Sequence, residues 1–390
     1  MNSTPVLERS PKTWDETKTT TCYMCACRCG IKVYLKDGSI TYIEGNRDHP
    51  VNKGVICGKG AAGIKQHTSP SRLSKPLLRV GERGAGEFKE IEWDEALSLA
   101  TKWLSDVRKT DPKKLAFFTG RDQSQGLTGW WATQFGTPNY AAHGGFCSVN
   151  MAAGMIYTIG GSFWEFGGPD LEKAKLFVMV GTAEDHHSNP MKIALSKFKR
   201  NGGRFISINP VRTGYSAIAD EWIPIKPGTD GALIMALIHE LIYANNVDHP
   251  FLKRYTNSAQ LVCLDPGPEE GLFLFDPNSD PINQDIPHNK YIWDQNTQSA
   301  KPCFDQNTQP ALTGEYVMGT GPHQGKRVAP AFELLQRQVK SCTPEWAEKI
   351  TSIPAARIRL LAKEMAHSAF EQSFELPIPW TDCFGNQHAS

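Results

Sequence analysis

The chain has 390 residues, 40% of them apolar and 21% charged, and its formal net charge is +1 at pH 7. This length predicts more than one domain, and the composition is typical of globular proteins rather than disordered ones. The near-zero net charge gives no reason to expect nucleic acid as a partner. No apolar run approaches the roughly 20 residues of a membrane-spanning helix, so we expect no direct membrane insertion. The N-terminus also lacks an apolar export core and a twin-arginine pair, which predicts a cytoplasmic protein.

Four cysteines near the N-terminus have the spacing of a metal site. Cys22, Cys25 and Cys29 read C-x2-C-x3-C, and Cys57 follows after 27 intervening residues. Four thiolates can hold a 4Fe-4S cluster, because each of its irons needs one thiolate. A structural zinc site is the alternative, but such a site usually joins two C-x2-C pairs, and Cys57 stands alone. The spacing therefore favours the cluster, and Cys27 fits neither arrangement.

The residues between these cysteines predict a small β-rich domain. Alternating apolar residues flank "KDGS" at 36–39, which is a hairpin signal. We therefore expect residues 15–72 to form a β-rich domain held together by the cluster. The remaining cysteines, apart from Cys147, are expected to be ordinary thiols.

The segment "YAAHGGFCSVNMAAG" at 140–154 places Gly-Gly before Cys147 and small residues after it. This pattern predicts a turn from a loop into a helix that presents the thiol, with the helix dipole lowering its pKa. A thiolate is a suitable ligand for a soft, high-valent metal. Considered alone, however, a single cysteine is more often a buried thiol.

The middle of the chain alternates predicted strands with predicted helices. Such alternation predicts parallel βαβ units, and hence an α/β fold. The strands are expected at 175–181, 204–210 and 221–228, and the amphipathic helices at 189–202 and 229–246.

Parallel sheets bind ligands at the carboxyl ends of their strands. Here these ends carry small and polar residues, among them Gly181, and helices are expected to begin near Asn189 and Thr229. The N–H groups at such helix ends suit a pyrophosphate. The chain has no G-x-G-x-x-G motif, so an ordinary NAD site is not supported.

Residues 255–330 are rich in Pro, Asn, Asp and Gln, and "DQNTQ" occurs in them twice. This composition predicts an insertion with one or two hairpins. Helices are expected after it. The domain bounds that we predict are 15–72 for the cluster domain, 73–150 for the segment ending just after Cys147, 151–340 for the second α/β domain with its insertion, and 341–390 for a helical return.

Several motifs together resemble the N-terminal part of the molybdenum or tungsten oxidoreductases that bind bis(molybdopterin guanine dinucleotide), a family that includes dimethyl sulfoxide reductase, formate dehydrogenase and nitrate reductase. The matching segments are "CYMCACRCG", "GVICGKG", "IEWDEAL", "GFCSVNMAAG", "INPVRTGYSAIADEWIPIKPGTDGAL" and "TPEWAEKITSIPAARIRLLA". The resemblance implies a β-rich 4Fe-4S domain followed by Rossmann-like αβα domains. It also implies that the C-terminal part of the family fold is missing here.

The resemblance further assigns roles to individual residues. It implies that the four cysteines hold the 4Fe-4S cluster, that Lys59 helps to carry electrons between cluster and pterin, and that Cys147 binds molybdenum or tungsten. It implies guanosine contacts from Asn209, Arg212 and Asp230.

The implied function is electron transfer between a small substrate and a partner protein or subunit. The substrate would be an oxyanion, a sulfur compound or formate, and a separately encoded C-terminal half would complete the enzyme. The alternatives are an electron-transfer remnant that keeps only the cluster, and a zinc-stapled binding module.

Overall fold

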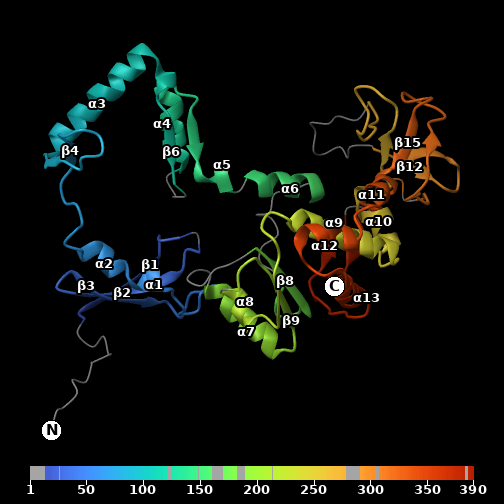
Figure 1. Cartoon of the computed structure of the whole chain (residues 1–390), viewed down its shortest axis with the longest axis horizontal. Helices are drawn as coiled ribbons and strands as arrows, with labels where there is room; N and C mark the ends of the chain where they lie inside the picture. The colour runs from blue at the N-terminus through green and yellow to red at the C-terminus, as the bar shows by residue number, and fades with distance from the viewer. Residues whose placement is uncertain are drawn as a thin grey trace, which may run out of the picture. The chain divides into compact units, whose positions relative to one another are not determined.

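The computed structural model describes residues 14–25, 27–120, 125–147, 149–159, 170–181, 189–212, 214–277, 290–303, 305, 307–382 and 385–390. The chain divides into two compact units, residues 1–170 with 186–193 and residues 171–185 with 194–390 (Figure 1). None of the helices in the described ranges combines the length and apolarity needed to cross a membrane.

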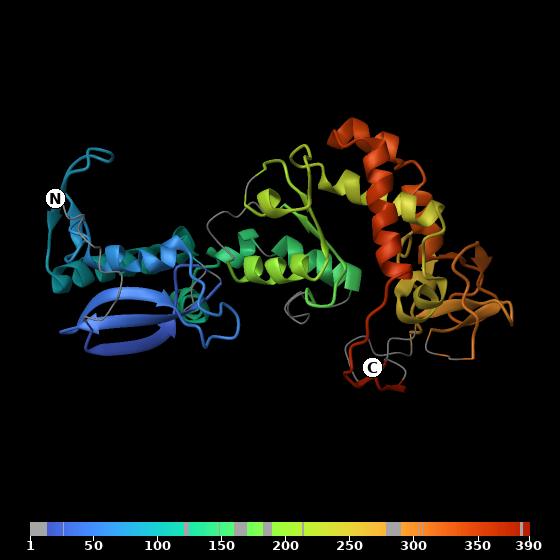
Figure 2. The same ribbon diagram turned by 90° about the horizontal axis from the view of Figure 1, so that it is seen from below.

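The first unit begins with an antiparallel sheet, visible as three adjacent blue strands in Figure 2. Asp37 and Gly38 form its hairpin turn with φ angles of 51° and 74°, and Lys36 lies opposite Ser39. Positive φ at both turn residues is what a type I′ hairpin requires, so the predicted hairpin is confirmed. Two short helices pack on the third strand. These elements are β1 (Glu16–Thr21), β2 (Gly30–Lys36), β3 (Ser39–Gly45), α1 (Gly58–Ala61) and α2 (Gly63–Thr68).

The rest of the first unit contains longer helices and two strand pairs. The predicted loop before Cys147 is wrong, because Gly144 and Gly145 lie in a helical turn that Cys147 ends. Glycine destabilises a helix only modestly, so the Gly-Gly pair did not exclude a helical turn. The elements are β4 (Leu77–Arg79), β5 (Phe88–Glu90), α3 (Trp93–Thr110), β6 (Phe117–Thr119), α4 (Gln125–Phe135), β7 (Tyr140–Ala142), α5 (His143–Cys147) and α6 (Val149–Ile159), with a 3-10 turn at Pro112–Lys114.

The second unit contains the predicted parallel sheet, in the order β10-β9-β8. On α9, Leu233 and Leu237 are buried, and Leu241 packs against the same core, as the predicted apolar stripe requires. Helices α12 and α13 pack on α9 (Figure 1). The α/β fold class is thereby confirmed. The elements are β8 (Leu176–Val180), α7 (Asn189–Arg200), whose residues 189–193 belong to the first unit, β9 (Arg204–Ile208), α8 (Tyr215–Ile218), β10 (Glu221–Ile223), α9 (Asp230–Tyr243), α12 (Pro344–Thr351) and α13 (Ala355–Phe370).

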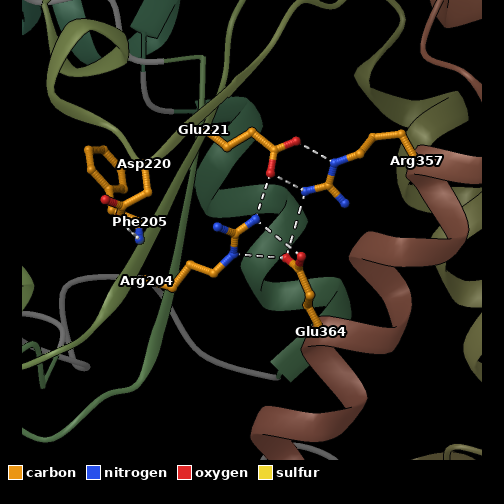
Figure 3. Close-up of polar contacts among 6 residues, drawn as sticks. All are labelled: Arg204, Phe205, Asp220, Glu221, Arg357 and Glu364. Atoms are coloured by element: carbon orange, nitrogen blue, oxygen red, sulfur yellow. Dashed lines mark hydrogen bonds and ion pairs between the residues drawn. The ribbon is translucent and has the colours of Figure 1, made fainter.

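Four charged side chains connect this sheet to α13 (Figure 3). Arg204 on β9 donates to Glu221 at 2.6 Å and to Glu364 at 3.2 Å. Arg357 on α13 donates to Glu221 through Nε at 2.5 Å and through Nη2 at 2.9 Å. The two arginines and two glutamates balance in charge, so the network joins strand and helix without net charge.

The region 255–330 forms antiparallel pairs, and its predicted hairpin is confirmed as β12 with β13. A second sheet has the order β11-β15-β14. Cys263 and Cys342 are buried in hydrophobic cores, as expected of ordinary thiols. The elements are α10 (His249–Tyr255), a 3-10 turn (Asn257–Ala259), β11 (Leu261–Cys263), β12 (Tyr291–Asp294), β13 (Ser299–Pro302), β14 (Tyr316–Val317), β15 (Arg327–Pro330) and α11 (Ala331–Val339), with β16 (Trp380–Thr381) and β17 (Gln387–His388) near the C-terminus.

The aspartates of the two "DQNTQ" segments accept hydrogen bonds from nearby residues. Asp294 is 2% exposed and accepts from the backbone N–H of Gln309 at 2.8 Å and from the hydroxyl of Thr297 at 2.7 Å. In the second copy, Asp305 accepts from the backbone N–H of Asn307 at 2.9 Å. The hydrogen bonds to Asp294, foremost the one from Gln309, hold its pKa at about 2, although burial opposes the shift.

We expect Asp294→Asn to lower the free energy of unfolding by about 2 kcal/mol, because charged acceptors make the stronger hydrogen bonds. Asp305→Asn is the matched control in the same pentapeptide, and about 0.5 kcal/mol is expected there. The stabilisation by Asp294 should be complete above pH 4 and lost as the pH falls towards 2, because the pKa of Asp294 is lower in the folded state than in the unfolded state. Urea unfolding at pH 7 and pH 3 measures both effects, and equal losses at the two pH values would contradict the assignment.

Candidate functional site

Three of the four predicted cluster ligands lie on the loop between β1 and β2. The backbone N–H of Cys22 donates to the carbonyl of Cys29 at 2.8 Å, directly beyond the paired residues Thr21 and Gly30. This bond closes the loop at its base, and within the loop Arg28 has a φ of 48°. The sheet therefore fixes both ends of the segment that carries Cys22, Cys25 and Cys29.

Cys57 comes to this loop on a separate segment, where it precedes α1 as the N-cap residue. A Cβ atom built on Gly60 of α1 would lie 3.5 Å from the Sγ of Cys22 and 2.7 Å from the side chain of Ile56. Gly60 therefore lies in van der Waals range of the Sγ of Cys22, and its lack of a side chain leaves room for Ile56. The sequence places the fourth cysteine 28 positions after Cys29, and the fold brings its helix against Cys22.

The thiols of this group influence one another electrostatically. The pKa of Cys29 is raised to about 11, first by burial and then by the neighbouring thiols of Cys27, Cys25, Cys22 and Cys57, in that order. Several thiolates at close range repel one another unless cations lie between them. The irons of a cluster supply such cations, so this donor set fits the predicted 4Fe-4S group.

Lys59 lies in α1, two residues after Cys57, and is half-buried. Burial raises the pKa of Cys25, whereas the backbone of Cys27 and, more weakly, the positive charge of Lys59 lower it. Lys59 is thus close enough to act on the thiol of Cys25.

Among the residues that the structure describes, no three His, Cys, Asp or Glu side chains form a site for a single metal ion.

Two residues of the predicted nucleotide site lie in the second unit, at the carboxyl edge of the parallel sheet. Gly181 follows β8 with a φ of 78° and donates its N–H to the carbonyl of Ile208. Asn209 follows β9 and donates its backbone N–H to the carbonyl of Ile223 on β10. Gly181 and Asn209 therefore occupy neighbouring strand ends, where parallel sheets bind ligands.

Asn209 is 2% exposed, and its Nδ2 atom has no hydrogen-bond partner among the described residues. Its Oδ1 accepts from the N–H of Val211 at 3.0 Å. A buried amide without a partner is costly, so a bound group that accepts this hydrogen bond fits the site.

Trp222 on β10 supports two of the predicted nucleotide contacts, and the sequence reasoning missed it. Its Nε1 donates to the carbonyl of Asn209 at 2.8 Å, and the guanidinium of Arg212 lies 5.9 Å from the centre of its ring. The tryptophan lies within the predicted strand at 221–228, but its contacts with the preceding strand depend on the parallel register.

The predicted helix starts are confirmed at both positions. Helix α7 begins at Asn189, and α9 begins at Asp230 with Thr229 as its N-cap residue. Thr229 does not cap the helix with its side chain, because its hydroxyl donates to the carbonyl of Lys226 at 2.6 Å. The backbone N–H groups at the start of α9 are therefore not satisfied by this side chain.

The side chains of Cys147 and Asn189 lie outside the described residues. The backbone places Cys147 at the end of α5, and α6 begins at Val149. The assignment of Cys147 to the metal stays a prediction.

Comparison with known proteins gives the class to which this fold and cysteine set belong. The sequence model of the molybdopterin oxidoreductase family matches residues 72–353, and that of the molybdopterin oxidoreductase Fe4S4 domain matches residues 15–69. The chain therefore belongs to the molybdopterin oxidoreductase family. The predicted family and the cofactors that name its two domains, molybdopterin and a 4Fe-4S cluster, are confirmed.

Among individual relatives, a sulfite dehydrogenase subunit of Allochromatium vinosum is 58% identical over 379 residues, which cover 96% of this chain and 39% of that protein. Dimethyl sulfoxide reductase DmsA of Haemophilus influenzae is 31% identical over 87% of this chain and 38% of its own length. The solved structure of acetylene hydratase from Pelobacter acetylenicus superposes with a TM-score of 0.59 at 20% identity, covering 88% of this chain and 38% of that one, and shows the shared fold. The chain thus spans well under half the length of these relatives.

Proposed function

We propose that this chain supplies the cluster-binding part and part of the cofactor-binding region of the catalytic subunit of a molybdenum oxidoreductase. The observation that carries the proposal is the approach of α1, with Cys57 and Lys59, to the cysteine loop between β1 and β2. In this proposal Cys22, Cys25, Cys29 and Cys57 each hold one iron. When bound, the cluster accepts and passes on single electrons.

The residues of the second unit would bind the nucleotide part of the cofactor. Asn209 would donate its unpartnered Nδ2 hydrogens to the bound group, and Trp222 would hold Asn209 and Arg212 in place. Gly181 exposes backbone at the neighbouring strand end. In the same proposal, the N–H groups at the starts of α7 and α9 bind phosphates, and Cys147 binds molybdenum or tungsten. The dinucleotide would be bis(molybdopterin guanine dinucleotide).

The proposed substrate is sulfite. This choice rests on the 58% identity to a sulfite dehydrogenase over nearly the whole chain, against 31% for the dimethyl sulfoxide reductase. Oxidation of sulfite to sulfate consumes one water and releases two protons and two electrons. The electrons would leave through the cluster to a partner protein or subunit.

Metal and substrate analysis of the chain purified without oxygen tests this proposal. We expect about four irons and one molybdenum or tungsten per chain. Acid hydrolysis should release guanine nucleotide, and sulfite should reduce an artificial electron acceptor faster than formate does.

The other outcomes each contradict a different part of the proposal. Zinc without iron would indicate a stapled binding module and refute the cluster. Iron without molybdenum or tungsten would indicate an electron-transfer protein that keeps only the cluster. Full metal loading with faster turnover of formate would refute sulfite as the substrate and leave the cofactor assignment intact.

A further inference from the structure

Asn52 is a buried polar residue in the segment between β3 and Cys57. Its side chain is 0% exposed, although its neighbours Val51 and Lys53 are exposed. Burying an amide is costly unless its hydrogen bonds are satisfied, so its contacts indicate its role.

The side chain of Asn52 joins the two segments that carry the third and fourth cysteines. Its Oδ1 accepts from the backbone N–H of Gly30 at 2.9 Å, and its Nδ2 donates to the carbonyl of the same residue at 3.0 Å. The Nδ2 also donates to the carbonyl of Val55 at 2.9 Å. Gly30 directly follows Cys29, and Val55 precedes Cys57 by two positions. A single amide therefore connects both ligand segments.

The turn around Asn52 is itself held in place. The ring of His49 accepts at Nδ1 from the backbone N–H groups of Val51 and Asn52, each at 3.4 Å. A Cβ atom on Gly30 would lie only 2.5 Å from Cδ2 of this ring, so His49 lies directly against the residue after Cys29. The backbone N–H of Val55 donates to the carbonyl of Asn52 at 2.8 Å. Contacts on both sides thus hold Asn52 in place.

We propose that Asn52 is a positioning residue that sets the separation of Cys29 and Cys57 and thereby retains the iron bound by Cys57. The inference rests on the proposed cluster ligands. Three ligands lie close together in sequence, but Cys57 comes from a distant segment, and closing that loop has an entropic cost. Groups that orient metal ligands change metal affinity about 10- to 100-fold when they are removed.

Asn52→Asp tests the proposal at nearly constant side-chain volume. The carboxylate still accepts from Gly30, but it turns oxygen instead of N–H towards the carbonyls of Gly30 and Val55. Gly38→Ala is the matched control, because Gly38 lies in the same sheet at the opposite end of β2 from Gly30. It has a φ of 74° and no atom within 4 Å of an added Cβ, so alanine there strains only the backbone.

The experiment oxidises the iron-loaded chain with ferricyanide and follows the electron paramagnetic resonance signal of a 3Fe-4S cluster. In that step one electron passes to ferricyanide, and one Fe²⁺ leaves the cluster. We expect Asn52→Asp to form the signal at least about tenfold faster than the wild type, and Gly38→Ala to match the wild type. The midpoint potential of the intact cluster should shift only in Asn52→Asp.

Equal rates and potentials in the two variants would overturn the inference, because loss of stability alone would then explain Asn52. If Asn52→Asp does not fold, Asn52→Ala removes the same bonds without adding charge and is judged by the same criteria. An iron-free wild-type chain would overturn the proposed function, and this inference with it. If the wild type is loaded with iron and the Asn52 variant loses iron no faster than the wild type, only this inference is overturned.

Discussion

Cys57→Ala is expected to leave the chain with fewer than about four irons and with weakened broad visible absorption, whereas Cys27→Ala is expected to keep both. Both thiols belong to the same group, and both raise the pKa of Cys29. They differ in position, because Cys57 precedes α1 and Cys27 lies within the loop between β1 and β2. Iron and sulfide analysis of the two purified variants measures the difference.

The comparison separates a ligand role from a general effect of removing a thiol. Cys27 and Cys57 are both half-buried, so the two substitutions are made at sites of similar exposure. Loss of iron in Cys27→Ala together with full iron in Cys57→Ala would show that the C-x2-C-x3-C reading is wrong. Cys342→Ala, in a core of the second unit, provides a thiol control far away in sequence, and full iron is expected there.

Short-range sequence patterns predicted much of this fold. The hairpin followed from Asp37 and Gly38, because few other residue pairs adopt two positive φ angles. The parallel sheet followed from apolar runs that alternate with an amphipathic helix. The approach of Cys57 to the cysteine loop followed from ligand chemistry, since a cluster must collect four thiolates wherever they lie in sequence.

Features that depend on the tertiary arrangement were not predicted. Asn52 stands in "HPVNKG", and an asparagine among turn residues usually satisfies its own turn, so nothing in that pattern indicated a bridge to Gly30. Arg204 and Glu364 are 160 positions apart, and no local spacing pairs them. The Gly-Gly pair before Cys147 was compatible with both loop and helix, and only the surrounding structure decides between them.

Arg357→Ala is expected to lower the free energy of unfolding of the second unit by about 3 kcal/mol. The side chain of Arg357 is 15% exposed, and those of Glu221 and Glu364 are 28% and 21% exposed. Without Arg357, these two partly buried carboxylates share a single partner, Arg204 (Figure 3). Arg359→Ala is the control on the same helix, where the side chain is 44% exposed and pairs with Glu345 at 2.7 Å and with Glu240 at 3.6 Å. Less than about 1 kcal/mol is expected there.

Salt and pH distinguish the two arginines further. Salt screens exposed pairs more than buried ones, so the loss in Arg357→Ala should persist in 1 M NaCl, whereas that in Arg359→Ala should shrink.

Burial alone would raise the pKa of Glu221, but the hydrogen bonds and charges of Arg357 and Arg204 outweigh it and lower the pKa. The stabilisation by Glu221 is therefore present at neutral pH and lost as the pH falls through its lowered pKa. In Arg357→Ala the acid-dependent part of the stability should diminish, because Glu221 has lost one of its two arginine partners. Urea unfolding at both salt concentrations and at neutral and acid pH measures these effects, and identical behaviour of the two variants would show that the network stabilises no more than a surface pair does.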